Sequence, residues 1–338
     1  MSEITKSVFK LFAKLLIASV PALMLLALYV KDDPFRVLYP YVNFYNSSIP
    51  TDRDYISTEV LLKKYPLEKY DSYILGSSKS LSFLCSQWDK YTGGKSFHFD
   101  ASGESVFGIL TKLSYLQRKK MPVKNCLLIV DSATLAETTN SSGHTYIKHP
   151  LVSGESRIKF QFTFLTAFLS NKFFVPYFFY KFNSKPPEFL EYPRITDPRE
   201  FTVDGSSNDM YFSFAERQMS KDINSYYEEH KRTFFERDST NKYVSKPAVG
   251  EPQLKELSEI KKIFDSEKTN YKFVIYPGYD LKYLNPADVE KLKGIFGAEN
   301  VFDYSGINEI TLDVKNYYDE AHCRALVGSR ILKEIYSK

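Results

Sequence analysis

From residue 71 onward, short apolar runs alternate with amphipathic segments, and this alternation constrains the fold more than any other feature of the chain. Strands are expected at residues 71–76, 97–99 and 126–130, and the last of these is continuously apolar, as in a strand covered on both faces. Between them, residues 80–91 and 106–117 carry apolar side chains at helical spacing. This β-α-β-α-β order predicts an α/β fold with a doubly wound, mostly parallel sheet.

The same pattern returns in the last third of the chain. We expect, in order, a charged helix with an apolar stripe after Pro252, a strand at 271–276, a helix at 288–296, a short strand at 301–304 and a closing helix at 325–336. Residues 69–338 are therefore expected to form one α/β domain with an insertion at about 136–250.

The expected insertion differs from the rest of the domain in composition. Residues 160–182 are almost entirely aromatic and aliphatic, but Gln161, Lys172 and Pro176 are among the residues that interrupt them, which disfavours a second membrane span. We expect instead a helical, aromatic-rich pair folded over the core domain, and its contact with a bilayer surface stays open. The polar stretch that follows includes a loop signal at 204–209, which makes the insertion a candidate substrate cap.

An apolar run at residues 11–30 is interrupted only by Lys14 and Pro21. Its uncharged part, residues 15–30, is slightly shorter than the ~20 residues that span a bilayer, and the Lys14 side chain can snorkel to complete the length. No small-x-small cleavage site follows the run, so we expect residues 1–33 to be a transmembrane signal anchor rather than a cleaved signal peptide.

The charges around the anchor predict its orientation. Lys6 and Lys10 precede the apolar run, so the N-terminus is expected in the cytoplasm and the folded domain in the periplasm or outside the cell. Residues 34–68, rich in Pro, Tyr and Asn at their start, are expected to form a juxtamembrane collar.

Composition argues against several classes of protein. The net charge is +4 from 45 basic and 41 acidic residues, and no long Lys/Arg run is present, so nucleic-acid binding is not predicted. Three cysteines are too few for a disulfide framework, and no metal-ligand spacing appears, so neither a metal nor a cofactor is expected. Cys126 is expected in the core, and Cys323 beside the candidate site.

A strand followed at once by glycine and hydroxyls, Tyr-Ile-Leu-Gly-Ser-Ser-Lys-Ser at residues 73–80, is the first candidate for chemistry. Gly76 would let the backbone turn at the strand end and lift the Ser78 hydroxyl above the sheet edge, where open α/β sheets bind ligands. A plain loop has the same pattern, and Ser77, Lys79 and Ser80 are neighbours with polar side chains.

The partners that a serine nucleophile needs occur near the other end of the chain. Asp319 lies three residues before His322, on the expected loop before the closing helix. A neutral imidazole can take the serine proton, and a carboxylate can fix the imidazole tautomer and stabilise its charged form. In a doubly wound sheet this loop and the end of the first strand share one rim, so Ser78, His322 and Asp319 could meet there.

These two motifs resemble the first and fifth blocks of the SGNH (GDSL-like) hydrolase superfamily, and residues 99–105 and 127–131 resemble the second block and the strand that leads to the third. The resemblance implies a three-layer, flavodoxin-like fold and an acyl-serine intermediate. It also implies an oxyanion hole formed by the backbone N–H groups of Ser78 and Gly103. Two departures stand out: the first block is Gly-Ser-Ser, and Asp131 occupies the strand end where an oxyanion asparagine is expected.

A membrane anchor followed by such a domain is similar to the layout of the D-alanine transfer and alginate O-acetylation proteins. The resemblance implies a serine O-acyl, most simply O-acetyl, esterase or transferase that acts on a cell-surface glycan, with a membrane acyltransferase as a partner. A second hypothesis is a non-catalytic binding or assembly protein that uses the same rim. A third is an esterase that prefers longer acyl chains.

Overall fold

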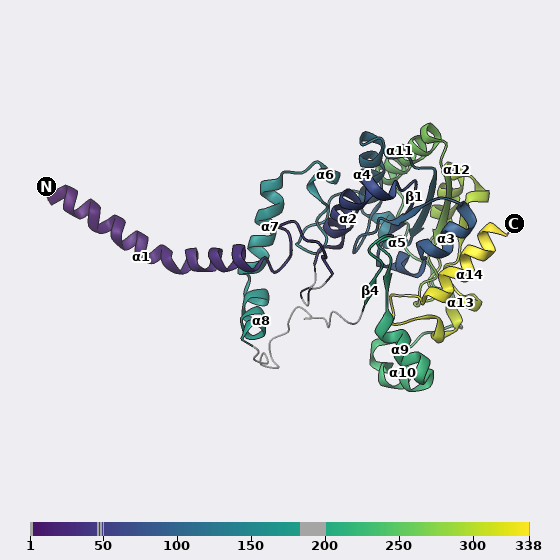
Figure 1. The fold of residues 1–338 in the computed structure, drawn as a ribbon. Helices are drawn as coiled ribbons and strands as arrows, with labels where there is room; N and C mark the ends of the chain where they lie inside the picture. The colour runs from purple at the N-terminus through teal and green to yellow at the C-terminus, as the bar shows by residue number, and fades with distance from the viewer. Residues whose placement is uncertain (1–2, 46, 48, 50, 183–200, 338) are drawn as a thin grey trace. The chain divides into compact units, whose positions relative to one another are not determined.

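The structure is a computed structural model that describes the chain except for residues 1–2, 46, 48, 50, 183–200 and 338 (Figure 1). It divides into two compact units. One unit comprises Met1–Thr51 with Ile158–Thr196, and the other comprises Asp52–Arg157 with Asp197–Lys338. The interval 136–250, expected from the sequence to be one insertion, is thus divided between the two units.

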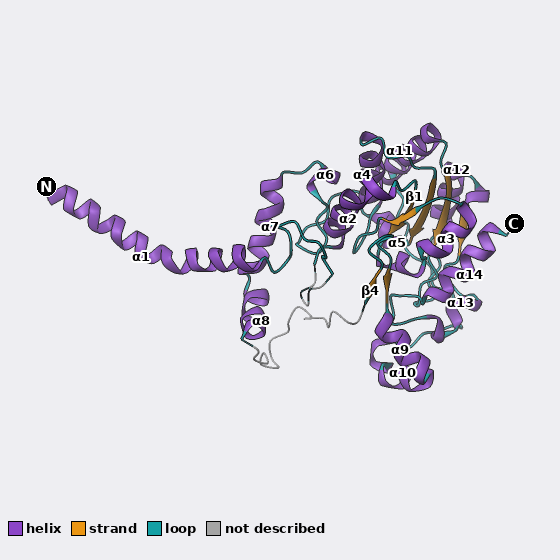
Figure 2. Ribbon diagram, viewed as in Figure 1, coloured by secondary structure: helices purple, strands orange, loops and turns teal. Residues whose placement is uncertain are grey.

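The second unit is built on a parallel five-stranded sheet (Figure 2). Its strands are β1 (Ser72–Gly76), β2 (Ser96–His98), β3 (Asn125–Val130), β6 (Asn270–Ile275) and β7 (Val301–Asp303). The order across the sheet is β2-β1-β3-β6-β7, and every neighbouring pair is parallel. The expected α/β class with a parallel sheet is confirmed. The chain reverses its direction across the sheet between β1 and β3, which is where open sheets of this kind bind ligands.

Helices cover both faces of this sheet. The larger ones are α2 (Arg53–Glu68), α3 (Cys85–Thr92), α4 (Val106–Arg118), α11 (Glu251–Glu267), α12 (Pro286–Phe296) and α14 (Ala325–Tyr336). Side chains of α3 and α14 pack on one face, against residues such as Ile74, Leu127 and Val274. On the other face Phe273 packs against Phe296 of α12 at a ring separation of 4.8 Å. All residues of β1 and β3 are buried, as expected for central strands covered on both sides.

Shorter elements complete the unit: α5 (Ser132–Ala136), α6 (Pro150–Ser153), the strand pair β4 (Thr202–Val203) and β5 (Met210–Tyr211), α9 (Ser213–Lys221), α10 (Ile223–Glu229), α13 (Glu309–Leu312) and four 3₁₀ turns. One of these turns, η1 (Ser78–Ser82), corrects the helix predicted at 80–91. The chain makes this turn first, and α3 begins only at Cys85.

The reason for glycine at position 76 also differs from the sequence-based expectation. Gly76 is still part of β1, and it is not among the glycines with positive φ. A Cβ there would lie 2.7 Å from the carbonyl oxygen of Ile129 on the neighbouring β3. Glycine is therefore required by the close approach of two strands, directly before the turn that carries Ser78.

The first unit contains α1 (Glu3–Asp32), α7 (Arg157–Leu169) and α8 (Asn171–Lys181). Within the described chain, α1 is the one helix long and apolar enough to cross a membrane, and the most apolar part of it is not buried. Length and composition fit a membrane anchor, and a signal sequence fits them equally. The position of this helix agrees with the expected N-terminal membrane segment.

The backbone of the closing helix α14 lies directly against the backbone of the η1 turn and the residue that follows it. A Cβ built on Gly328 would lie 1.9 Å from the carbonyl oxygen of Ser82 and 3.0 Å from the nitrogen of Phe83. No side-chain rotation can relieve such a contact, so only glycine lets α14 lie this close to η1.

Gly328→Ala should therefore lower the free energy of unfolding by about 3 kcal/mol, at the upper end of what overpacking typically costs. Gly294→Ala is the matched control in α12, because its Cβ would meet nothing within 4 Å. It should instead stabilise the protein by about 0.5–1 kcal/mol through helix propensity. Urea unfolding of the full chain in detergent measures both, and equal midpoints would contradict the close packing of α14.

Candidate active site

Ser78 is the first residue of η1, directly after β1 and Ser77. The Ser77 hydroxyl accepts a hydrogen bond from the N–H of Lys79 at 3.4 Å, and its carbonyl accepts one from the N–H of Ser80 at 2.8 Å. The turn is thus closed by local bonds immediately at the carboxyl end of a buried strand. This arrangement holds the half-buried Ser78 side chain on a rigid support.

Asp319 and His322 lie in a tight loop before α14. The loop is closed by a bridge between Tyr317 and Cys323 and by a 2.8 Å bond from the N–H of Tyr318 to the carbonyl of His322. Oδ1 of Asp319 accepts from the backbone N–H of His322 at 2.9 Å. The carboxylate is therefore fixed by the backbone before it contacts the imidazole.

The structure brings the three predicted residues together. Nε2 of His322 lies 2.9 Å from Oγ of Ser78, although the two residues are 244 positions apart. Nδ1 of His322 lies 2.9 Å from both carboxylate oxygens of Asp319. The side chains of His322 and Asp319 are 22% and 35% exposed, so the group is open to solvent and to a ligand.

Asp319 is set up to act as the ionised partner of the imidazole. Its partial burial would raise the pKa of the carboxyl group, but the hydrogen bond and charge of His322 and two backbone N–H groups more than offset this effect. The net result is a pKa of Asp319 below its ordinary value. A carboxylate bonded to Nδ1 favours the tautomer in which Nε2 can accept the proton of Ser78.

A buried tyrosine places the loop over the sheet edge. Tyr276 follows β6 and bonds through its own N–H to the carbonyl of Val130 at 2.8 Å. Its hydroxyl accepts from the N–H of Cys323 at 2.6 Å and donates to the carbonyl of Ala321 at 3.0 Å. Burial raises the pKa of Tyr276 well above its ordinary value, so the hydroxyl keeps the proton that it donates.

The segment 202–230 supplies contacts that the sequence did not predict. The ring of Phe212 packs on His322 at 5.3 Å and stacks on Tyr318 at 4.4 Å. Glu216 of α9 accepts from the Tyr318 hydroxyl at 2.7 Å and pairs with Arg324 at 2.8 Å. No short-range pattern in the sequence marks these residues, because their partners lie about a hundred positions away.

Gly103, the second residue expected in an oxyanion hole, follows β2 at the same edge of the sheet. The N–H of Ala101 bonds to the carbonyl of Gly76 at 3.2 Å, so the chain just before Gly103 still runs beside the end of β1. Gly103 is exposed and has a φ of +55°, a conformation that glycine adopts without strain. Within the described chain, neither its N–H nor that of Ser78 donates a hydrogen bond to a protein group.

Asp131 lies at the end of β3, where the resemblance called for an asparagine. Its carboxylate accepts from the N–H of Thr134 at 2.8 Å and forms an ion pair with Lys79. Burial would raise the pKa of Asp131, but the charge and hydrogen bond of Lys79 together with the hydrogen bonds from Thr134 more than offset it, and the pKa lies below its ordinary value. Asp131 therefore stays an acceptor and cannot donate to an oxyanion.

A polar pocket opens beside the Lys79–Asp131 pair, at the carboxyl ends of β3 and β6. Its walls include Lys79, Asp131, Ser245, Tyr276, Asp280 and Lys282. Charges of both signs and several hydroxyls line it, so the pocket suits a polar ligand better than an alkyl chain.

A second serine–histidine–aspartate group lies in the core of the same unit. His98 contacts Oγ of Ser80 through Nε2 at 2.9 Å and Oδ1 of Asp209 through Nδ1 at 3.0 Å. Unlike the first group, the His98 and Asp209 side chains are 0% exposed. His98 is therefore a core residue, and its hydrogen bonds explain how a polar ring is tolerated there.

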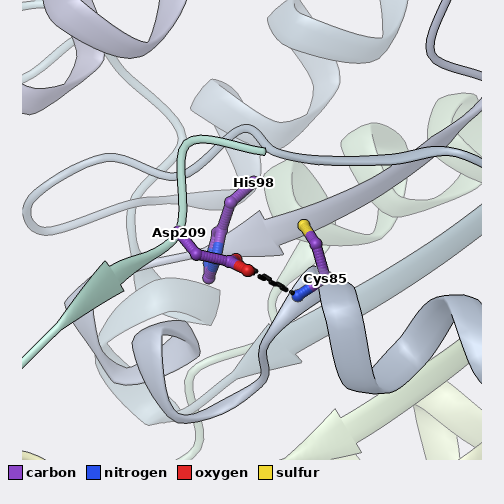
Figure 3. A group of neighbouring side chains, drawn as sticks. All are labelled: Cys85, His98 and Asp209. Atoms are coloured by element: carbon purple, nitrogen blue, oxygen red, sulfur yellow. Dashed lines mark hydrogen bonds and ion pairs between the residues drawn. The ribbon is translucent and has the colours of Figure 1, made fainter. Parts of the chain in front are cut away.

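Cys85 adjoins this buried group, and Figure 3 shows its backbone nitrogen facing the Asp209 carboxylate. One ligand atom each from Cys85, His98 and Asp209 lie within 4.8 Å of one another, an arrangement that the sequence spacing did not predict. Burial and the Asp209 charge raise the pKa of the Cys85 thiol well above its ordinary value. A protonated thiol is a poor metal ligand, and the histidine and carboxylate already pair with each other, so the group fits a core hydrogen-bond network better than a metal site.

Cys323, expected beside the site, is buried, and its thiol contacts the carbonyl of Pro277 at 3.6 Å. Burial raises the pKa of the Cys323 thiol to about 12, so it remains protonated near neutral pH. Cys126 is fully buried in β3, in agreement with its expected place in the core.

Comparison with known proteins identifies no family: no family model and no curated protein matches this chain.

The two serine–histidine–aspartate groups should differ sharply in their contribution to stability. His98→Ala leaves the Asp209 carboxylate buried without its ring partner and should cost about 3 kcal/mol of unfolding free energy. His322→Ala removes a partly exposed ring and should cost about 1 kcal/mol or less. Urea unfolding of both variants tests this, and similar losses would show that the buried group is not the structural one.

Proposed function

We propose that this protein is a membrane-anchored serine O-acyl esterase or acyltransferase of the SGNH type, acting on a cell-surface glycan. The observation that carries the proposal is the 2.9 Å contact between His322 Nε2 and Ser78 Oγ, with Asp319 bonded to the opposite ring nitrogen. The parallel sheet and the place of Ser78 beside the reversal between β1 and β3 support the same family.

In the proposed first half-reaction, the Ser78 oxygen attacks the carbonyl carbon of an ester while His322 takes its proton. The resulting oxyanion would bond to the N–H groups of Ser78 and Gly103, and each such donor typically contributes about 3 kcal/mol to lowering the barrier. Collapse of the intermediate breaks the ester bond, and His322 returns the proton to the leaving alcohol. The acyl group is then an ester of Ser78.

In the second half-reaction, water or a sugar hydroxyl gives its proton to His322 and attacks the acyl-serine. The bond between the acyl carbon and Ser78 Oγ then breaks, and His322 returns the proton to Oγ. Attack by water releases the acid, and attack by a sugar hydroxyl transfers the acyl group. The polar pocket is lined by Asp131 and by Lys79, the residue after Ser78, and this supports a polar, hydroxyl-rich acceptor. Acetyl is proposed as the acyl group on the resemblance of the sequence alone.

The absence of an asparagine at the Asp131 position favours the second candidate, a non-catalytic glycan-binding or assembly protein. With Asp131 held ionised by Lys79, the oxyanion hole would have two backbone donors instead of three donors. The same rim would then hold a polymer or a membrane acyltransferase without turning over an ester.

Labelling with a fluorophosphonate and turnover of a chromogenic acetyl ester separate these candidates. Ser78→Ala and His322→Ala should abolish both signals, and Asp319→Asn should slow turnover by roughly 10⁴-fold, because it misorients the imidazole. Ser80→Ala is the matched control, since this serine has its own histidine but is buried. The fraction of folded protein that carries the label should be the same in that variant as in the wild type.

Persistent labelling of folded Ser78→Ala protein would contradict the assignment of the nucleophile. A folded wild-type protein that neither labels nor hydrolyses any ester, yet binds a surface polysaccharide, would support the binding candidate instead.

A further inference from the structure

In the first unit, α7 and α8 lie beside the end of α1 (Figure 1), and their aromatic side chains form a core with residues of α1 and of the chain that follows it. Phe164 and Phe168, one turn apart on α7, are fully buried. Their rings lie 5.5 Å from Phe35 and 5.2 Å from Tyr29, respectively. From α8, the ring of Phe173 lies 4.6 Å from Phe35. One face of the helix pair is therefore buried against the end of α1 and the residues that follow it.

Polar bonds attach the pair to the same short stretch of chain. Asp32, the last residue of α1, accepts from the Tyr177 hydroxyl and pairs with Lys181, both at 2.8 Å. The side-chain amide of Gln161 donates to the carbonyl of Val37 at 3.0 Å. All of these contacts fall at residues 29–37, where the apolar helix gives way to charged residues.

This attachment fixes the depth of α7 and α8 relative to a bilayer that α1 crosses. Lys31 and Asp32 would be costly in hydrocarbon, so the end of α1 must lie at the level of the lipid headgroups. Helices bonded directly to this end must lie near the same level.

The outer surface of the pair remains strongly apolar. Ile158, Phe162 and Leu169 of α7 lie at i, i+4 and i+11, which places them on one face, and they are 82%, 66% and 48% exposed. Phe178 of α8 is 49% exposed. Large exposed apolar side chains that share one face of a helix mark an interaction surface rather than the single, scattered exposure that soluble proteins tolerate.

The charge of residues 157–182 favours a lipid surface as the partner of the exposed apolar side chains. No Asp or Glu occurs from Arg157 to Phe182, whereas Arg157, Lys159, Lys172 and Lys181 are basic and exposed. Aromatic residues combined with Lys and Arg are typical of helices that lie in the membrane interface, where the cations meet anionic headgroups.

We propose that α7 and α8 form an interfacial membrane element, with Phe162 and Phe178 immersed among the headgroups of the bilayer that α1 spans. The inference requires α1 to lie in a membrane and is independent of the proposed chemistry at Ser78. The first unit would then hold the membrane with one spanning helix and two helices parallel to its surface.

Depth-dependent quenching tests the proposal on the full chain in nanodiscs of phosphatidylcholine and phosphatidylglycerol. Phe162→Cys and Phe178→Cys variants carry an environment-sensitive fluorophore, and the native cysteines Cys85, Cys126 and Cys323 are buried and should not react. Leu16→Cys in α1 is the positive control for insertion. Thr163→Cys, on the polar side of α7 and next to Phe162, is the matched negative control.

Lipids brominated near the headgroups should lower the emission of the labels at 162 and 178 at least about twofold, because interfacial helices bury their apolar face ~5–10 Å deep. The label at 163 should respond less to bromolipid and more to aqueous iodide. Unfolding midpoints equal to wild type confirm that the labelled variants are folded.

The proposal would be overturned if iodide quenched the labels at 162 and 178 as strongly as the label at 163, while the label at position 16 stayed protected from iodide. If the labels at 162 and 178 were shielded from iodide in native membranes but not in nanodiscs, the proposal would be overturned, and a protein partner would be the occupant of this surface. Iodide quenching of the label at position 16 would show that α1 does not lie in the membrane, and the proposal would then fail as well.

Discussion

The candidate site depends on one buried hydroxyl. Tyr276 joins β6 to β3 through its backbone and joins the loop of His322 to β6 through its side chain, which accepts from Cys323 and donates to Ala321. The loop that carries the imidazole is therefore anchored to the sheet. Because Ser78 is also held by the sheet, through the strand pair β1 and β3, the two halves of the site share one rigid frame.

Burial distinguishes the two serine–histidine–aspartate groups more clearly than distance does. Both have contacts near 3 Å, from Ser78 to His322 and from Ser80 to His98. The first is partly open to solvent, whereas the side chains of His98 and Asp209 have no exposed surface. The buried group ties the segment at 204–209 to the turn that carries Ser78, since Asp209 lies in the loop between β4 and β5 and Ser80 lies in η1. One group can meet a ligand, and the other supports it.

The features that depend on a local pattern of residues could be predicted from the sequence. Continuous apolar runs predicted β1, β3 and β6, and helical spacing predicted α14 with the bounds that the structure gives. Since parallel strands end at one edge, the meeting of Ser78 with His322 also followed from topology. The contacts of Phe212 and the pairing of His98 with Asp209 could not be predicted, because both bring together residues more than a hundred positions apart that carry no shared periodicity. The role of Gly76 was missed for a similar reason: it depends on Ile129 of another strand.

The long separation between Ser78 and His322 has a consequence for biogenesis. Synthesis delivers the serine 244 residues before the histidine that contacts it. A growing polypeptide therefore presents the hydroxyl for most of its emergence without an imidazole to deprotonate it. The proposed chemistry would be silent throughout that interval and would begin only when the loop before α14 docks, after synthesis of nearly all the preceding residues.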